Sequence, residues 1–465
     1  MSDATRQRHA TTVLWCALAF GVLLRALVLW QTGDLGTGIV DEQHYRRIAT
    51  NIFERHEFSA TAGQPTSIRP PLYPALVAGI WTITGPQDLQ AVRLVQIALG
   101  LATAALVYAI GRRVFNHQTG CYAAALCWLY PSLIFFNFLI LTETLFTFLL
   151  LAFVLLTVLL HQKPGVAVAA AAGAALGLAA LTRSVLWPVP LILCPALVLM
   201  ISGTVPRRLL YSSLVLAGYL VVIVPWAVRN TRLQETTTIV DTMGGINLRM
   251  GNYEFTPEDR MWDAVSISGE KSWVRGFSVP PGVSPTEGRK EKWAQAMAVA
   301  YMRDHPAQTI RRSFIKFADF WGLEREFIAG VQEGLFAPPP WFALAATVAI
   351  VLGYALVVTV GAAGIWLAPA SDWRLHATLL FPILLTMGAH AIVFGHSRYH
   401  MPLMPILGLY AAHLFVARRP LAQAYRRPAL AAAALSIGVL ATIWIRQIVI
   451  VDAARLGSLL HRVVG

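Results

Sequence analysis

Long apolar stretches follow one another along most of this chain, separated by short polar loops and by one long polar segment. Several stretches reach the length of about 20 residues that a helix needs to cross the hydrocarbon core of a bilayer. The pattern therefore predicts an all-α polytopic membrane protein with about 11 transmembrane helices. The expected spans lie near Thr12–Gln31, Leu89–Gly111, Gly120–Phe138, Thr142–Leu160, Gly165–Leu181, Val185–Ser202, Leu209–Val228, Pro340–Leu367, Leu375–Gly395, Met401–Val416 and Ala429–Val449.

One apolar stretch is too short to be a comfortable span. Pro71–Gly85 has only about 15 residues, fewer than a crossing helix needs. If it crossed, every later loop would change sides and the basic loops would face outward, against the usual enrichment of Lys and Arg in cytoplasmic loops. We therefore expect an interfacial or re-entrant helix here.

Basic residues set the orientation of the predicted spans. Arg6 and Arg8 precede the first span. Further Lys and Arg residues then occur in the loop at every second crossing. These loops contain Arg112, Arg113, Lys163, Arg207, Arg208, Arg374, Arg418, Arg419, Arg426 and Arg427. Such loops are predicted to be cytoplasmic. The polar stretch Met1–Ala10 precedes a full-length span without a cleavage site, which indicates a retained anchor.

The amino-acid composition also indicates a membrane protein. Of the 465 residues, 56% are hydrophobic and 13% are charged, against roughly 25% charged residues in soluble domains. The net charge of +13 does not indicate nucleic acid, because much of it lies in short loops that meet anionic lipid headgroups. The four cysteines fall inside apolar runs, where packing is a better explanation than disulfide pairing.

The predicted topology divides the chain into three parts. Residues 1–228 would form an N-terminal membrane module that includes a first outer loop at 32–88, and residues 340–465 a C-terminal membrane module. Residues 229–339 between them would form a small extracytoplasmic cap. This segment contains a Gly/Pro/Ser-rich loop at Ser278–Thr286 and the stretch GGINLRMGN, which reads as a glycine-punctuated structural turn.

Three acidic residues lie at the predicted outer ends of spans. Asp41 and Glu42 open an amphipathic stretch that reads as a helix after the first span, and Glu143 begins the fourth span. Neighbours on a helix point about 100° apart, so only one of Asp41 and Glu42 can face a given site. Structural alternatives exist, because Asp41 could be a helix N-cap and Glu143 could interact with a helix dipole. Their shared membrane level favours a site.

Isolated arginines lie on the same predicted side, where the orientation rule does not require them. Each alone could be a snorkelling anchor, but together they resemble a receptor for phosphate, which guanidinium groups bind in bidentate fashion. Prolines in RPPLYP and YHMPLMP break helices at this level, which is tolerated where the backbone lines a protein cavity. The arginines are Arg25, Arg69, Arg93, Arg183 and Arg398.

Other motifs are weak or lacking. The histidines near these residues lack a zinc-binding spacing such as HExxH. No Walker loop or GxGxxG fingerprint supports ATP-driven or dinucleotide chemistry. No cofactor is predicted with certainty, although Asp41 and Glu143 could hold a divalent metal ion.

The ordered set of motifs resembles the bacterial GT-C glycosyltransferases, and within them the branch of protein O-mannosyltransferases and lipid A aminoarabinose transferases. The motifs that carry the resemblance are the acidic pair, RPPLYP, the acid opening the fourth span, the Arg after the fifth span, PWAVRN followed by GGINLRMGN, and SRYHMPLMP. The WWD signature of oligosaccharyltransferases and the extra lumenal domains of eukaryotic protein mannosyltransferases are absent from the sequence. Transfer of whole glycans to asparagine and a protein acceptor are therefore unsupported.

The resemblance implies a multi-pass enzyme of the bacterial inner membrane with its active site facing outward. It would transfer a sugar, with inversion, from a polyprenyl-phosphate donor to a lipid or glycan acceptor. Asp41 would be the base with Glu42 as its partner, although the sequence leaves open which of the two is the base, and Glu143 would be the second site acid. The substrate-binding candidates are Arg69, Tyr73, Arg93, Arg183, His396, Arg398 and Tyr399.

Two other functions are compatible with charges at membrane level. A flippase or transporter for lipid-linked sugars would share the intramembrane charges and broken helices. The lack of an internal repeat and the confinement of the charges to one face disfavour it. A ligase or polymerase acting on polyprenyl-diphosphate glycans is the nearer alternative.

Overall fold

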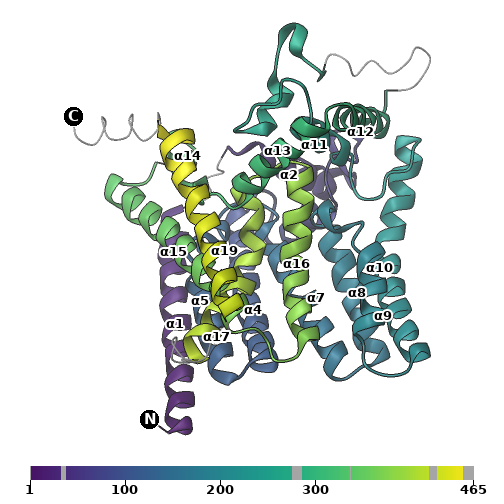
Figure 1. The fold of residues 1–465 in the computed structure, drawn as a ribbon. Helices are drawn as coiled ribbons and strands as arrows, with labels where there is room; N and C mark the ends of the chain where they lie inside the picture. The colour runs from purple at the N-terminus through teal and green to yellow at the C-terminus, as the bar shows by residue number, and fades with distance from the viewer. Residues whose placement is uncertain (1, 33–37, 275–284, 336, 418–426, 454–465) are drawn as a thin grey trace.

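The computed structural model describes residues 2–32, 38–274, 285–335, 337–417 and 427–453. Figure 1 shows a bundle of long helices, with the N-terminus at its lower end and a group of shorter helices across its upper end. Among the described residues, 8 stretches are long and apolar enough to cross a membrane. They are α1 (Asp3–Thr32), α4 (Leu89–Val114), α7 (Glu143–Gln162), α10 (Val205–Gln234), α15 (Pro340–Leu367), α16 (Trp373–Ile392), η5 with α17 (Ser397–Leu403 and Met404–Ala417), and α19 with η6 (Arg427–Arg446 and Gln447–Val451).

The predicted fold class, an all-α polytopic membrane protein, is confirmed, but the count of about 11 spans is not. The remaining predicted spans contain shorter helices, namely α5 (His117–Leu129), α8 (Val166–Ala180) and α9 (Pro190–Met200). The stretch expected to be interfacial or re-entrant forms the 13-residue helix α3 (Leu72–Thr84). At 1.5 Å per residue α3 is about 20 Å long, less than the thickness of a hydrocarbon core.

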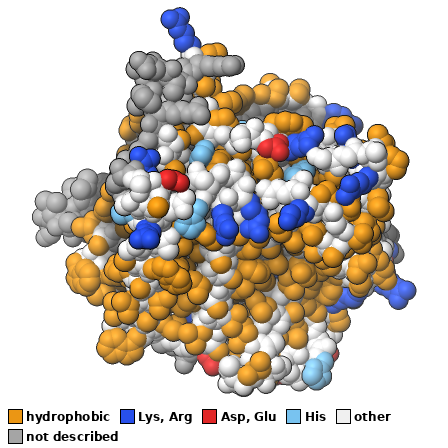
Figure 2. Space-filling view, turned by 90° about the horizontal axis from the view of Figure 1, so that it is seen from below, with side chains coloured by type: hydrophobic (Ala, Val, Ile, Leu, Met, Phe, Trp, Pro, Cys, Tyr) orange, Lys and Arg blue, Asp and Glu red, His pale blue; other side chains and the backbone are white. Residues whose placement is uncertain are grey.

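The loops predicted to be cytoplasmic meet at one end of the bundle. Gln118 beyond α4 donates to the Asp3 carboxylate at 3.3 Å. Gln162 at the end of α7 donates to the Arg113 carbonyl at 3.2 Å. In Figure 2, which views the molecule from below, Lys and Arg side chains lie mostly in the upper half of the view, among hydrophobic ones. Of the predicted basic group after α17, Arg418, Arg419 and Arg426 lie outside the described residues.

The opposite end is built from the first loop and the segment between α10 and α15. The first loop forms α2 (Val40–Arg55) and a small hairpin of β1 (Ser59–Thr61) and β2 (Gln64–Pro65), which the sequence did not predict. The later segment forms α11 (Gly244–Gly251), η2 (Met261–Ser266), η3 (Gly269–Lys271), α12 (Glu287–Asp304), α13 (Pro306–Phe320) and α14 (Glu326–Gln332). Figure 1 shows these helices gathered over the bundle. Two short helices, α6 (Pro131–Phe136) and η1 (Ser184–Leu186), connect the spans at this end.

Two local expectations are wrong. The stretch GGINLRMGN is the helix α11 rather than a turn. The N-cap of α2 is Ile39, without a side-chain cap, so Asp41 lies inside the first turn and does not cap the helix. The predicted Gly/Pro/Ser-rich loop at Ser278–Thr286 lies outside the described residues up to position 284.

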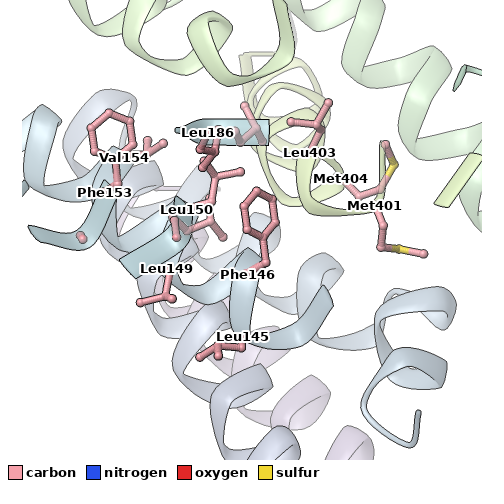
Figure 3. Packing of buried hydrophobic residues seen from close by; sticks show 14 of the residues in the cluster. Leu145, Phe146, Leu149, Leu150, Phe153, Val154, Leu186, Met401, Leu403 and Met404 are labelled. Atoms are coloured by element: carbon pink, nitrogen blue, oxygen red, sulfur yellow. The ribbon is translucent and has the colours of Figure 1, made fainter. Parts of the chain in front are cut away.

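One hydrophobic core runs through both membrane parts of the chain. It joins residues from Tyr45 in α2 to Ile443 in α19, and Figure 3 shows side chains of α7 gathered with Leu186, Leu403 and Met404. The segment 229–339 adds a smaller core around Met261. It is held tightly to the bundle, because a Cβ on Gly251 would lie 1.8 Å from the carbonyl oxygen of residue 393 and one on Gly395 would lie 2.0 Å from that of residue 316. Only glycine permits such close approach of two backbones.

Candidate active site

Asp41 presents its carboxylate to a cavity at the upper end of the bundle. The helix α2 places it in the first turn, where the free amides of a helix N-terminus favour negative charge. Its side chain is 30% exposed, and both oxygens are engaged. Oδ1 accepts a hydrogen bond from Arg69 Nη2 at 2.6 Å, and Oδ2 accepts one from Arg398 Nη1 at 3.0 Å.

Arg398 links Asp41 to the second acid of the site. Its Nε donates to Glu143 Oε1 while its Nη1 donates to Asp41. Arg183 Nη2 lies 3.4 Å from the same Glu143 oxygen. Three segments that are far apart in the sequence, α2, the start of α7 and η5, therefore meet at one guanidinium group. The expectation that Asp41 and Glu143 share one level of the membrane agrees with this contact.

The cavity beside this cluster has a volume of about 970 Å³. It is lined by Asp41, Arg69, His396, Arg398 and Tyr399, all of them predicted site residues. Glu143 and Arg183 pack behind this wall and are not among the lining residues. With an exposed fraction of 1%, Glu143 is positioned to hold the arginines rather than to touch a ligand.

The cluster places positive charge around a carboxylate. Burial alone would raise the pKa of Asp41, but the guanidinium groups of Arg69 and Arg398 outweigh it and hold that pKa well below its usual range. Burial and the nearby Arg69 lower the pKa of His44, whose Nδ1 lies 3.1 Å from Arg69 Nη2. A neutral imidazole nitrogen can accept from Arg69, so Asp41 and His44 both orient this guanidinium.

Three further predicted site residues reach neither the cavity nor the acid–arginine cluster. Glu42 is fully buried and pairs with Arg46 at 3.7 Å. Tyr73 is fully buried and donates to Gln96 Oε1 at 2.8 Å. Arg93 is 2% exposed and donates from Nε to the carbonyl oxygen of residue 138 at 3.0 Å. Their polar groups satisfy partners in the helix bundle, so their placement supports a structural role.

The far wall of the cavity holds charged residues that the sequence reasoning missed. Arg325 pairs with Asp452, and Arg446 lies 3.7 Å from Asp319. Trp262 adds an aromatic face, with its ring 4.6 Å from that of His396. These residues lie on α13, α19 and η2, immediately before α14 and immediately after η6, far from any motif. The only sequence signal that could have pointed to Arg446 is its position as a charged residue beside the apolar residues of α19.

A buried polar network fixes the segment that carries Arg398. His400 is fully buried, with its Nε2 3.2 Å from Glu324 Oε1 and its ring stacked on Tyr354 at 4.7 Å. Glu324 also accepts from Tyr130 at 2.9 Å and from Ser132. The segment SRYHMPL is a 3₁₀ helix interrupted by Pro402. These side-chain contacts therefore stabilise a segment whose 3₁₀ backbone, interrupted by Pro402, lacks the regular hydrogen bonds of an α-helix.

The arrangement does not fit a divalent metal ion. Asp41 and Glu143 are the two carboxylates that the sequence offered for such an ion, and Arg398 bridges them. A guanidinium placed between two carboxylates satisfies the negative charge that a cation would need. Within the residues that the structure describes, no group of three or more His, Cys, Asp and Glu side chains could hold a metal ion.

A helical membrane bundle with this acid–guanidinium cluster beside a cavity has the features of a membrane-embedded enzyme. Residues 68–228 match the family model described as dolichyl-phosphate-mannose-protein mannosyltransferase. The match covers about a third of the chain and agrees with the resemblance to glycosyltransferases that use a polyprenyl-phosphate sugar. No curated protein sequence matches the chain.

Solved structures similar to this chain are distant. The oligosaccharyltransferase of Archaeoglobus fulgidus in the apo form is 16% identical, with a TM-score of 0.49 over 93% of this chain and 56% of that chain. This chain thus spans just over half the length of that protein. ArnT from Cupriavidus metallidurans in the apo state is 17% identical, with a TM-score of 0.39 over 85% of this chain and 77% of that chain. ArnT bound to undecaprenyl phosphate is 15% identical, with a TM-score of 0.40 over 86% and 78%.

Proposed function

We propose that this protein transfers a sugar, with inversion, from a polyprenyl-phosphate donor to a hydroxyl or amine of a lipid or glycan acceptor. One observation carries the proposal: a carboxylate and two guanidinium groups, Asp41, Arg69 and Arg398, face the same cavity. The description of the family that matches residues 68–228 names dolichyl-phosphate mannose, which is a polyprenyl-phosphate sugar, and this supports the proposed donor class.

The proposed reaction uses the cluster as follows. The acceptor oxygen or nitrogen attacks C1 of the sugar, and the bond from C1 to the phosphate oxygen breaks with its electron pair leaving on the polyprenyl phosphate. Arg69 and Arg398 stabilise the growing negative charge on that phosphate. Asp41 takes the proton that the acceptor loses. No step passes through a metal ion.

The geometry favours Asp41 over Glu42 as the base. Asp41 lines the cavity, whereas Glu42 is fully buried and does not line it. A base must come within hydrogen-bond reach of the proton that it removes, either directly or through one water molecule. Glu143, which is also buried, would position Arg398 and Arg183.

Apolar residues of the same cavity are suited to a prenyl chain. Phe135, Phe136, Leu139 and Leu141 line it, from α6 and the turn that precedes α7. A donor could thus place its phosphate on the arginines and its first isoprene units on this wall. We further propose that the cavity faces the outside of the bacterial inner membrane, since the basic loops gather at the opposite end of the bundle.

Sugar transfer by purified Asp41→Asn protein tests the proposal. With a synthetic polyprenyl-phosphate sugar as donor and total cell-envelope lipid and glycan as acceptor, transfer should fall by about 100-fold or more, as expected for loss of a general base. Glu42→Gln is the matched control and should lose less, unless it disturbs folding, which the thermal unfolding midpoint reveals. Full transfer by Asp41→Asn would remove Asp41 as the base.

The alternative functions predict different results in the same preparation. A flippase would move labelled lipid-linked sugar across reconstituted vesicles without consuming it. A diphosphate-dependent ligase would transfer glycan from a polyprenyl-diphosphate donor in preference to a monophosphate donor when the two compete. Either result would replace the proposed function.

A further inference from the structure

The two arginines that line the cavity beside Asp41 are already paired with this carboxylate of the protein. Arg69 Nη2 donates to one Asp41 oxygen at 2.6 Å, and Arg398 Nη1 donates to the other at 3.0 Å. Arg69 and Arg398 are 17% and 16% exposed, so each reaches the cavity with only a small part of its side chain. Asp41 therefore occupies the positions in which two phosphate oxygens would be bound.

This placement creates a conflict for the proposed reaction. A carboxylate held by two guanidinium groups is a poor proton acceptor, because their positive charge stabilises its ionised form. The phosphate of a lipid donor needs the same two groups. One side chain thus blocks the anion site and is at the same time kept from acting as a base.

We propose, on the basis of the proposed function, that Asp41 is an internal counter-ion of the phosphate subsite, which the donor phosphate displaces, and that the displaced carboxylate then serves as the base. Donor binding and base activation would be a single exchange of partners. The acceptor would lose its proton only when the leaving group is already bound. Such an order prevents Asp41 from activating water in the empty cavity.

The contacts of the cluster allow this exchange. Arg398 can release Asp41 without becoming an isolated cation, because its Nε stays on the buried Glu143. Arg69 also keeps a partner when Asp41 leaves, because its Nη2 lies 3.1 Å from His44 Nδ1. Asp41, at 30% exposed, is the most accessible member of the cluster and the one most free to turn.

Exchange of the arginines from Asp41 to the donor phosphate makes Asp41 a better proton acceptor. When the two guanidinium groups turn to phosphate, Asp41 loses its positive neighbours and gains a negative one, and both changes raise its proton affinity. The proton of the acceptor then passes to Asp41 as the C1–oxygen bond breaks and the electron pair stays on the polyprenyl phosphate. After the product leaves, Asp41 returns its proton to water and pairs again with Arg69 and Arg398.

Direct binding of a polyprenyl monophosphate, the product without its sugar, tests the inference on the full-length protein in detergent. We expect Asp41→Asn to bind this lipid about tenfold more tightly than the unsubstituted protein, because the substitution removes a competing charge from the subsite. The same variant should transfer sugar about 100-fold or more slowly. Gain of binding together with loss of transfer is not expected from a residue that acts only as a base or only as a structural partner.

Asp263→Asn is the matched control, since Asp263 lines the same cavity and pairs with Arg260 at 3.1 Å, away from Arg69 and Arg398. It should change binding by less than about twofold, as expected for an exposed ion pair. Equal or weaker binding by Asp41→Asn, or an equal gain in the control, overturns the inference but leaves the proposed function standing. If the unsubstituted protein neither binds the lipid nor transfers sugar, the proposed function fails and the inference fails with it.

Discussion

Arg398 shows how one side chain can assemble a site from distant parts of a chain. Its guanidinium group contacts Asp41 on α2 and Glu143 on α7, which lie 357 and 255 residues away in sequence. Arginine is suited to this position because it remains charged and offers several donors in a fixed plane. Lysine carries the same charge but has one compact ammonium group, which cannot span two carboxylates in the same geometry.

We expect Arg398→Lys to reduce sugar transfer by about 100–1,000-fold, similar to loss of a preorganised donor in other active sites. Arg398→Gln should be at least as damaging because it also leaves the buried Glu143 with one cation fewer. The rate of transfer from a polyprenyl-phosphate sugar measures both. Arg260→Lys, in the same cavity wall but paired with the exposed Asp263, should keep most of the activity. Near-normal transfer by Arg398→Lys would show that the bidentate geometry is unimportant.

This cluster was predictable from the sequence because a charged side chain at the level of the membrane is energetically costly. A charge near apolar spans needs a partner, and Asp41, Glu143, Arg69, Arg183 and Arg398 find one another in the structure. The same criterion cannot separate a ligand-binding arginine from a structural one. Arg25 and Arg93 carry the same signature, yet both are buried and donate to carbonyl groups of the bundle.

At the scale of elements, α13 is joined to its neighbours by a buried lysine. Lys316 is fully buried, and its Nζ donates to Asn252 Oδ1 at 2.9 Å and to the carbonyl oxygen of Ile392 at 2.8 Å. Both partners are neutral, so no carboxylate offsets the cost of burying the charge. Burial lowers the pKa of Lys316 to about 7.

This lowered pKa predicts a pH dependence of stability. Between about pH 7 and pH 10 the unfolded chain binds a proton at Lys316 that the folded protein releases, so stability rises with pH by at most about 1.4 kcal/mol per unit. Below about pH 7 both states bind the proton and this contribution is constant. Thermal unfolding from pH 6.5 to 9 should show a smaller slope for Lys316→Met than for the unsubstituted protein. Lys292→Met, at a lysine that is 46% exposed, should leave the slope unchanged, and equal slopes for all three would contradict the prediction.

A second contact joins the cap to the segment that carries Arg69. Glu287, at the start of α12, accepts from Thr66 Oγ1 at 2.5 Å and from the Ser67 amide at 2.7 Å. Glu287→Gln places an amide against these donors, so we expect a loss of about 1–3 kcal/mol in the free energy of unfolding. Sugar transfer should also fall, because Arg69 follows this segment. Glu235→Gln, in an ion pair where Glu235 is 55% exposed, should cost less than about 1 kcal/mol. A cost for Glu287→Gln no larger than that of the control, measured by chemical unfolding in detergent, would show that this contact is unimportant.

Elements differ in how well the sequence predicts them. Spans follow from the length of apolar runs, and their predicted ranges contain helices throughout the described chain. The cap segment has no comparable signal. Its helix α11 contains three glycines, which disfavour a helix locally, but close backbone approaches at Gly245 and Gly251 require two of them. The charged residues of the far wall, such as Arg325 and Arg446, come from segments that only the fold brings together, so they were not predictable from sequence motifs.

At the scale of the whole molecule, the bundle separates an end with the acid–arginine cluster from an end with the basic loops. The helix α7 begins at Glu143 in the cluster and ends at Gln162, beside Arg113. Its 20 residues correspond to about 30 Å, close to the thickness of a hydrocarbon core. The two ends should therefore lie on opposite sides of the membrane.

Cysteine labelling determines which end faces outward. In a background with the four native cysteines replaced, Ala62→Cys would place a thiol in the exposed turn between β1 and β2, and Lys163→Cys would place one in the exposed loop after α7. Because Lys and Arg favour cytoplasmic loops, a membrane-impermeant maleimide should label position 62 in intact cells and position 163 only after permeabilisation. The reverse pattern would put the cavity in the cytoplasm, where the acceptors would be cytoplasmic rather than envelope glycans or lipids. Labelling of both positions from one side would contradict the assignment of α7 as a membrane span.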